Sequence, residues 1–420
     1  MKITLTQFRP NTAEAVWTDC FAQAIAELHK AGGGVLTVPT GEYSTGPIEL
    51  CSNMELHLEP GAVIRFLNDP AAFPLQECQY EGRISHRPKP CLSAFNAENV
   101  ALTGSGVLDG CGAPWWAAQR ARTLANGRPY LLHFENVTHL RVCGVQLHNS
   151  PAWTVHPLNC VDVLIEDVSI CNPYNSPNTD GINPESCRDV RILNCRVDVG
   201  DDCITLKSGT EETPSPVPCE NIVIANCLLV HGHGGIVIGS EMSGGVRNVT
   251  VTNCVFTGTD RGLRVKTRRR RGGCVENLRL SNLVMERVFC PFVFNMYYSC
   301  GTAEKDRWVW EKTPYPVDGG TPAFRNIRIN GVTVVGATAS AGFFYGLAES
   351  PIDGLSLTDC HIEMARGAAP EKPAMMGNLE PMSARGFFLR NAKNVEFHNV
   401  TLKNADGEAY DTDESVDGEF

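Results

Sequence analysis

A short phrase recurs along this chain and constrains its fold more than any other feature. The phrase has a polar first residue, alternating apolar positions and an Asn-Cys or Asn-Leu ending, and its clearest copies begin at Asn221, Asn248 and Asn277. Weaker copies begin at Asn99, Asn136, Asp162, Asp189, Asn326, Gly354 and Asn394. The shortest start-to-start spacings are 26 to 29 residues, and longer ones indicate inserted segments. Such a period predicts a solenoid of stacked coils.

Within each repeat, apolar and polar residues alternate as in β-strands, and Gly, Asn and Asp separate the strands. Helical periodicity is almost absent after the first 35 residues. One such coil cannot bury its apolar face alone, whereas stacked coils share a continuous core and pair their strands about 4.8 Å apart. The sequence therefore predicts an all-β fold, a right-handed parallel β-helix.

The two ends of the chain differ from the repeats. Residues 18–31 carry apolar residues on one helical face and stop at Gly32–Gly34, which predicts a short N-terminal helix that caps the solenoid. Residues 406–420 are acidic and poor in apolar residues, so we expect a disordered tail there. No linker or shift in composition divides the remainder, which predicts a single β-helix domain over residues 1–405.

The chain contains 18 cysteines, which raises the possibility of disulfides or a zinc site. Paired C-x-x-C spacing is absent from the sequence. Four cysteines instead occupy the same place in their repeats, as small apolar residues of an inward-facing ladder do: Cys195, Cys227, Cys254 and Cys360. We therefore expect buried, reduced thiols and no bound metal.

The start of the sequence, Met-Lys-Ile-Thr-Leu-Thr-Gln, has no apolar leader with a cleavage site, and no segment is long enough to cross a membrane. The sequence thus predicts a cytoplasmic protein without membrane contact. The net charge of −11 and the lack of interleaved aromatic residues disfavour nucleic-acid binding, even at the run Arg268–Arg271. That run either extends an anion-binding groove or forms a solvated loop.

Four polar stretches carry the candidate chemistry: Asn178-Thr179-Asp180, Asp201-Asp202, Gly232-His233-Gly234 and Arg264-Val265-Lys266. Their charged residues follow the preceding repeat start by 12 to 18 residues, so a solenoid places them in one sector of neighbouring coils. Asp201 and Asp202 are adjacent, and a regular strand would direct them to opposite faces. We therefore expect a turn or bulge at this pair.

Three crowded carboxylates perturb one another's pKa values and leave an acid beside a base. Glycoside hydrolysis requires this combination, because one carboxyl protonates the leaving oxygen while another attacks or activates water. Arg264 and Lys266, two residues apart on a strand, point to the same face and are suited to grip a sugar carboxylate. The residues therefore indicate an acidic glycan as ligand.

The four stretches resemble, in order, the signatures of the polygalacturonases of glycoside hydrolase family 28, with Val265 in place of a more usual Ile. Segments 31–39, 45–50 and 103–110 are similar to bacterial members, and segment 239–246 resembles bacterial exo-acting galacturonidases. The resemblance covers nearly the whole chain. It implies a pectin-lyase-like solenoid, a bacterial-type enzyme, and an inverting mechanism without a metal or other cofactor.

The resemblance also implies catalytic roles. Asp201 is expected to be the general acid for the glycosidic oxygen, and Asp180 together with Asp202 holds and deprotonates the water. His233 is expected to orient or tune the acid. These residues would hydrolyse the α-1,4-galacturonosidic bonds of oligogalacturonides.

Four further residues are expected to bind substrate. Arg264 and Lys266 would hold the galacturonate carboxylate at the cleaved bond, and Tyr297 would stack on or hydrogen-bond the same sugar. Asn178 would position Asp180 or the substrate. The oligomeric state is left open.

Two insertions bear on the mode of attack. One contains Trp115 and Trp116, and the other contains Trp308, Trp310 and a Pro/Gly-rich loop over residues 313–322. These loops either wall off one end of the groove or pack on the flank of the β-helix. A closed end suits exo action on imported oligogalacturonides, which is the mode that we expect.

Several rival interpretations stay open from the sequence. The aspartate and histidine stretches are also typical of solvated turns, and Arg264 with Lys266 of a solvated face. Rhamnogalacturonan or another pectin-derived glycan is an alternative substrate. A calcium-dependent pectate lyase and a non-catalytic polysaccharide-binding β-helix are further alternatives.

Overall fold

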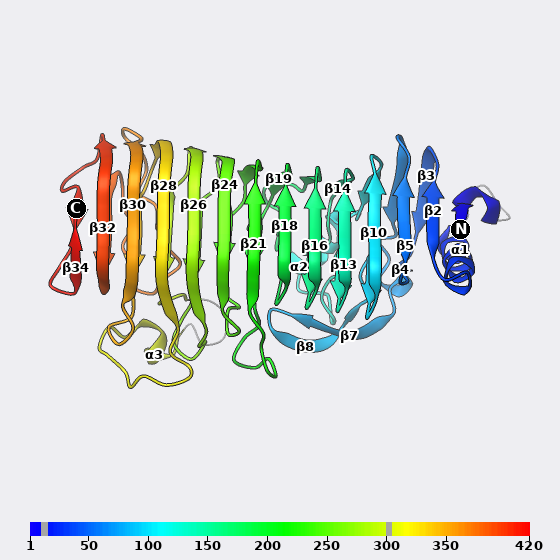
Figure 1. Cartoon of the computed structure of the whole chain (residues 1–420), viewed down its shortest axis with the longest axis horizontal. Coiled ribbons are helices and arrows are strands. Elements are labelled where there is room, and N and C mark those ends of the chain that lie inside the picture. Colours follow the sequence, from blue (N-terminus) through cyan, green and yellow to red (C-terminus); the bar gives the residue numbers. More distant parts are fainter. Residues whose placement is uncertain (10–15, 300–304) are drawn as a thin grey trace. The chain divides into compact units, whose positions relative to one another are not determined.

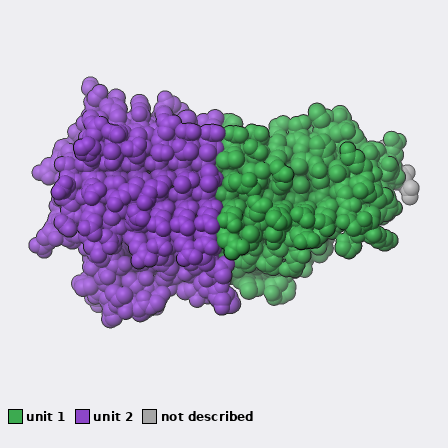
Figure 2. All heavy atoms as spheres, in the orientation of Figure 1, with its two compact units in different colours: residues 1–201 green, residues 202–420 purple. Residues whose placement is uncertain are grey.

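The computed structural model of the protein describes residues 1–9, 16–299 and 305–420. The chain folds into two compact units, Met1–Asp201 and Asp202–Phe420, which are coloured separately in Figure 2. Each unit consists of parallel strands stacked coil upon coil (Figure 1), so the predicted all-β parallel β-helix is confirmed. The single domain over residues 1–405 stays a prediction.

The first unit has a long sheet and a four-stranded second sheet. The long sheet contains β1 (Lys2–Thr4), β2 (Gly34–Val38), β3 (Gly41–Thr45), β5 (Met54–Leu58), β6 (Ala62–Phe66), β10 (Glu98–Gly104), β11 (Val107–Asp109), β13 (Thr138–Cys143), β14 (Gln146–His148), β16 (Val161–Glu166), β17 (Ser169–Cys171), β18 (Arg188–Leu193) and β19 (Arg196–Val199). The second sheet contains β4 (Ile48–Leu50), β9 (Leu92–Phe95), β12 (Leu132–Glu135) and β15 (Val155–Leu158). The first unit also contains an antiparallel hairpin of β7 (Leu75–Tyr80) and β8 (Arg83–Pro88), the short helices η1 (Leu5–Phe8) and η2 (Pro70–Ala72), and the helices α1 (Thr18–Lys30) and α2 (Ala113–Arg120).

The second unit repeats this arrangement. Its long sheet contains β21 (Cys219–Ala225), β22 (Leu228–His231), β24 (Val246–Thr257), β26 (Cys274–Glu286), β28 (Ala323–Ala337), β30 (Ile352–Met364), β32 (Ala392–Lys403) and β34 (Val416–Glu419). Its second sheet contains β20 (Ile204–Leu206), β23 (Ile236–Ile238), β25 (Arg261–Lys266), β27 (Cys290–Asn295), β29 (Ser340–Tyr345), β31 (Arg385–Arg390) and β33 (Tyr410–Asp411), and α3 (Arg307–Trp310) lies in a connection.

The repeated Asn residues turn the chain at the corners of the coils. Asn226, Asn253 and Asn282 have φ between 54° and 59°, in the left-handed region that Asn tolerates better than most residues. Their side-chain amides also form a ladder, because Asn253 donates to Asn226 at 3.2 Å and Asn282 donates to Asn253 at 2.7 Å. The repeat pattern therefore encodes both the turn and the contact between coils.

Inward-facing side chains fill the core. Cys195, Cys227, Cys254 and Cys360 are at most 2% exposed, as the predicted apolar ladder requires. Cys254 pairs in register with Leu283 of β26, so sulfur and branched apolar side chains share one stack. The 17 cysteines in the described part of the chain are free thiols.

The predicted capping helix is confirmed as α1 (Thr18–Lys30), which buries Phe21 and Leu28. The prediction of a disordered tail over residues 406–420 is wrong, because this segment forms regular strands. Strands β33 and β34 lie there, paired with β31 and β32, and the ring of Phe420 packs on Phe397 at 5.5 Å. Two aromatic residues thus anchor a segment whose acidic composition suggested disorder. None of the helices in the described ranges is long and apolar enough to span a membrane.

Candidate active site

In the first unit, Asp180 lies where the chain passes the end of β15. The Asp180 carbonyl accepts a hydrogen bond from Thr154 N at 2.8 Å, and Ile182 bridges to Val155 in parallel register. Asn183 Nδ2 donates to Asp180 Oδ2 at 3.1 Å, and both side chains are buried. The carboxylate is therefore fixed by backbone pairing and by a neighbouring amide.

Asp201 approaches Asp180 within this unit, with carboxylate oxygens that lie within 4.8 Å of one another. Residues 200–203 form the expected break between β19 and β20. Gly200 N donates to Thr179 Oγ1 at 3.3 Å, which ties the break to the Asp180 segment. The predicted neighbourhood of Asp180 and Asp201 is thus present in the structure.

Asn178 is held by a buried arginine. Arg128 Nη2 donates to Asn178 Oδ1 at 2.6 Å, while Nη1 donates to the carbonyls of Pro151 and Pro177 at 2.9 and 2.5 Å. Arg128 is 3% exposed, and burial is the main cause that lowers its pKa. Asn178 therefore has a fixed orientation beside Asp180, and Arg128 is a positioning residue that carried no signal in the sequence.

In the second unit, Asp202 lies between two cations. Arg264 Nη1 is 3.0 Å from Asp202 Oδ1, and Lys266 Nζ is 2.7 Å from Asp202 Oδ2. All three side chains are buried, and both cations project from the same face of β25, as expected. Burial opposes ionisation of Asp202, but Lys266 and Arg264 outweigh it and hold its pKa well below the usual range. Asp202 is therefore a carboxylate, and the cations gather where a sugar carboxylate is expected.

His233 lies between β22 and β23 and is exposed, and its charge is a minor cause of the low pKa of Asp202. The neighbouring Gly234 lies where the site leaves no space for a side chain. A Cβ at this position would lie 2.5 Å from Val237 Cγ2 and 3.3 Å from both Arg264 Cδ and Asp202 Oδ1. Any larger residue would press on the cation cluster.

Tyr297 does not lie at the cation pair. It is fully buried, and its ring instead contacts Lys312 and Arg269, whose cationic centres lie 3.3 and 5.3 Å from the ring centroid. The adjacent Tyr298 takes the expected place, with Lys266 Nζ 5.4 Å and Arg264 Cζ 5.8 Å from its ring centroid. The aromatic residue at the site is therefore Tyr298.

The hairpin β7–β8 covers part of the second sheet of the first unit. Its tip is a tight turn with φ of 51° at Glu81 and 74° at Gly82. Tyr80 stacks on Trp153 at 4.8 Å, and Gln79 Nε2 donates to Glu185 Oε1 at 2.6 Å. The hairpin was not predicted from the sequence, although Glu-Gly between two short alternating runs is a weak signal for it.

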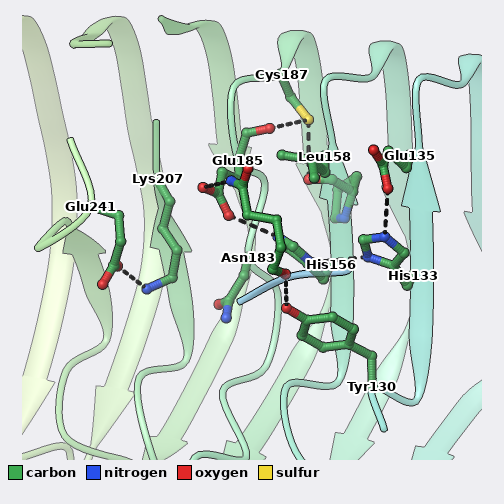
Figure 3. A network of polar contacts seen from close by, with 12 residues as sticks. Tyr130, His133, Glu135, His156, Leu158, Asn183, Glu185, Cys187, Lys207 and Glu241 are labelled. Atoms are coloured by element: carbon green, nitrogen blue, oxygen red, sulfur yellow. Dashed lines mark hydrogen bonds and ion pairs between the residues drawn. The ribbon is translucent and has the colours of Figure 1, made fainter. Parts of the chain in front are cut away.

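A buried polar network lies under the hairpin (Figure 3). His133 Nδ1 is 3.0 Å from His156 Nδ1, and His156 Nε2 is 3.0 Å from Glu185 Oε2. The Tyr130 hydroxyl donates to the Gln79 carbonyl of the hairpin at 2.6 Å. The face of the second sheet near Asp180 is therefore polar, and hairpin β7–β8 covers it.

The tryptophan insertions pack against the protein. Trp115 and Trp116 of α2 are 2% and 6% exposed, and Trp116 Nε1 donates to the Ser150 carbonyl at 2.9 Å. Trp308 lies beneath Arg270, whose Cζ is 4.3 Å from the ring centroid. Of the two sequence alternatives, packing on the flank therefore holds for Trp115 and Trp116.

Three arginines of the run, Arg268, Arg269 and Arg271, are structural rather than solvated, whereas Arg270 is exposed. Arg268 and Arg271 both pair with Glu211 at 2.6 Å, and Arg269 pairs with Glu349 through two hydrogen bonds of 2.5 and 2.9 Å. Arg269 also donates to the carbonyls of the loop that contains α3. The run therefore fastens loops beside β25.

A second buried ion pair follows β20. Lys207 Nζ lies 2.7 Å from Glu241 Oε2, and both residues are buried (Figure 3). Burial opposes ionisation of Glu241, but Lys207 outweighs it and lowers the pKa to about 2. No role for this pair was predicted from the sequence.

Comparison with known proteins agrees with these features. The model of glycosyl hydrolases family 28 matches residues 36–367. A probable polygalacturonase from Vitis vinifera is 30% identical over 363 residues, which are 84% of this chain and 72% of that protein. An endo-polygalacturonase from Pectobacterium carotovorum subsp. carotovorum is 30% identical over 272 residues, which are 61% of this chain and 65% of that protein.

Among solved structures, the exopolygalacturonase of Thermotoga maritima has a TM-score of 0.76 and 29% identity, and the match covers 96% of this chain and 92% of that one. This likeness supports the right-handed form of the predicted β-helix. The cytoplasmic, bacterial-type placement expected from the sequence is wrong. The relatives include polygalacturonases from the plants Vitis vinifera and Gossypium barbadense and an exopolygalacturonase from Platanus acerifolia.

Proposed function

The chain belongs to family 28 of the glycosyl hydrolases, and we propose that this glycoside hydrolase removes galacturonate from one end of oligogalacturonides by cleaving α-1,4-galacturonosidic bonds. The observation that carries the proposal is the cluster of Asp202, Arg264 and Lys266. Two buried cations converge there on one carboxylate, and such a pair of cations suits a sugar that bears a carboxylate. Neutral sugars would gain little from it.

In the proposed mechanism, Asp201 donates its proton to the glycosidic oxygen, and Asp180 with Asp202 holds the water and removes its proton. The low pKa of Asp202 supports this role, since only an unprotonated carboxylate can take a proton from water. Asn183 and the Arg128–Asn178 contact support Asp180 by fixing its surroundings. His233 tunes the charge near Asp202.

The hairpin β7–β8 supports attack from a chain end. Tyr80 of the hairpin stacks on Trp153 at 4.8 Å, and the next residue, Thr154, donates its backbone N–H to the Asp180 carbonyl, so the hairpin lies near the Asp180 segment. The hairpin is fastened by the Gln79–Glu185 hydrogen bond and by Arg87, whose Nη2 donates to the Arg128 carbonyl at 3.2 Å. A fixed wall beside a catalytic carboxylate limits the number of sugars that fit on that side.

We also propose inversion at the anomeric carbon, as the family resemblance implies. The general geometry of inverting glycosidases separates the two carboxyl groups by about 6.5–9.5 Å. Here the Asp180 and Asp201 oxygens lie within 4.8 Å of one another, a spacing nearer to that of retaining enzymes. The anomeric form of the first product is therefore an essential measurement.

The test is a time course on trigalacturonate and polygalacturonate, with products resolved by size and their anomeric form followed by proton NMR. Galacturonate from the first time points, in inverted configuration, is the expected result. Asp201→Asn should abolish release, whereas Asp198→Asn, which changes a carboxylate paired with Arg196, should leave it unchanged. Oligomers of mixed length at early times would show endo action instead.

The same experiment separates the other candidate functions. Unsaturated products that absorb in the ultraviolet and disappear with EDTA would identify a lyase. Cleavage of rhamnogalacturonan but of neither galacturonide would identify a different pectic substrate. Binding without turnover of any substrate would identify a non-catalytic protein.

A further inference from the structure

The segment of residues 365–384, which connects β30 to β31, folds back onto the face of the second sheet that carries the cation cluster. Arg261 of β25 fastens it by donating to the carbonyls of Pro373 and Lys372 at 3.0 and 2.8 Å. Met376 forms an antiparallel bridge with Tyr298. We call residues 365–384 the return segment. Its backbone is therefore held in place above the cluster.

The return segment carries Met375 to Arg264. The Met375 carbonyl accepts hydrogen bonds from Asn295 Nδ2 and Ser299 N, both at 3.0 Å, which fixes its backbone. Its sulfur lies 3.1 Å from Arg264 Nη2 and 3.8 Å from the Tyr298 hydroxyl. The residue is nevertheless 42% exposed. A fixed backbone thus presents the thioether of a partly exposed residue to a buried guanidinium.

Two contacts of the guanidinium differ in strength. Nη1 contacts a carboxylate, Asp202, whereas Nη2 contacts the Met375 sulfur, which is a weak hydrogen-bond acceptor. A carboxylate forms a stronger, charge-assisted hydrogen bond with the same group. An arriving uronate carboxylate would therefore replace the sulfur. Because the Met side chain is flexible, it can move aside without a change in the backbone.

We propose that Met375 is a specificity-determining residue of the uronate site: its sulfur occupies the Nη2 end of Arg264 until the sugar carboxylate displaces it, and the thioether then packs on that sugar. This inference rests on the proposed function. It adds that the return segment, together with Tyr298, shapes the site.

The test places a carboxylate where the sulfur lies. In Met375→Glu the new side chain should pair with Arg264 and compete with substrate, so KM for trigalacturonate should rise about tenfold or more while kcat changes less than about threefold. In Met375→Leu, which keeps the apolar bulk without the acceptor, KM should not rise. Val317→Glu, which adds the same charge at a 70% exposed position of this unit, is the matched control.

Oxidation gives an independent measurement. Hydrogen peroxide converts the thioether to a sulfoxide and water, and the sulfoxide oxygen is a stronger acceptor for Arg264. Treatment should raise KM of the wild-type enzyme, methionine sulfoxide reductases should restore it, and Met375→Leu should resist. A KM for Met375→Glu within twofold of the Val317→Glu value, or equal sensitivity of Met375→Leu to peroxide, would overturn the inference. A wild-type enzyme that cleaves no galacturonide would instead refute the proposed function.

Discussion

Lys266 and Asp202 form an ion pair in which Nζ lies 2.7 Å from Oδ2 and both side chains are less than one-tenth exposed. Arg264 contacts the other oxygen of the same carboxylate. Each charge is removed from water, so each depends on the others for its stability. One carboxylate thereby links the fold of the second unit to the proposed chemistry.

Replacing Asp202 by Asn should impair both the stability of the fold and the proposed catalysis. The amide cannot take a proton from water, so kcat/KM on trigalacturonate should fall about 10²–10⁴-fold. Two buried cations would also lose their counter-charge, which should lower the free energy of unfolding by about 3–5 kcal/mol. Initial rates and urea unfolding measure the two effects, with Asp198→Asn as control. Wild-type turnover in Asp202→Asn would remove this residue from the mechanism.

The Lys207–Glu241 pair should make stability depend on pH. The folded-state pKa of Glu241, about 2, is below its ordinary value of 4.5. Its contribution is therefore complete above about pH 4.5 and is lost as the pH falls toward 2. Glu241→Gln should lower the free energy of unfolding by about 3–5 kcal/mol at pH 7, and the difference from wild type should shrink below pH 4.5.

Urea unfolding at pH 7, 5 and 3.5 measures this dependence. The double variant Lys207→Met, Glu241→Gln removes both charges and should recover much of the lost stability. If the difference in the free energy of unfolding between wild type and Glu241→Gln stays constant from pH 7 to 3.5, the ion pair does not cause that difference.

The repeat and the proposed catalytic carboxylates were predictable because both follow from local spacing. An Asn at the repeat position of Asn253 marks a corner of each coil. The alternation of side chains along a strand puts Arg264 and Lys266 on one face. The choice between Tyr297 and Tyr298 was not predictable in this way. They follow the end of β27, where the Asn295 side chain accepts from Tyr297 N at 2.8 Å and the regular alternation stops.

The hairpin and the return segment were missed for a different reason. Gln79 meets Glu185, 106 residues away, and Arg261 meets Pro373, 112 residues away. A repeat of about 27 residues fixes contacts between successive coils, but it contains no information about insertions that fold back over several of them. The tryptophans of two insertions suggested that those insertions border the site. The segments that do border it, the hairpin and the return segment, have an ordinary composition.

Asn183 offers a test of how Asp180 is positioned. Asn183→Ala removes the hydrogen bond to Asp180 Oδ2, so the carboxylate should lose its orientation and kcat should fall about 10- to 100-fold with little change in KM. Steady-state kinetics on trigalacturonate checks this. Asn391→Ala, which removes a side-chain hydrogen bond to the Gly346 carbonyl in the second unit, controls for general loss of stability. Equal kcat values for both variants would make Asn183 purely structural.

The hairpin β7–β8 should decide where a chain is cut. Replacing residues 76–87 by a short Gly-Ser linker removes the Tyr80–Trp153 stack and the Gln79–Glu185 hydrogen bond, and it uncovers the polar face that contains His133 and His156. Polar and aromatic side chains are suited to bind sugar rings, so longer chains should then extend past Asp180.

The early products from polygalacturonate should therefore change from galacturonate alone to oligomers of mixed length, and the viscosity of the solution should fall faster per bond cleaved. Because the deletion also exposes Trp153, a milder variant is needed in parallel. Gln79→Ala with Tyr80→Ala loosens the wall without removing it and should give a smaller shift in the same direction. If both variants remain active and still release only galacturonate, the hairpin does not set the mode of attack, and the closed end of the site must lie elsewhere.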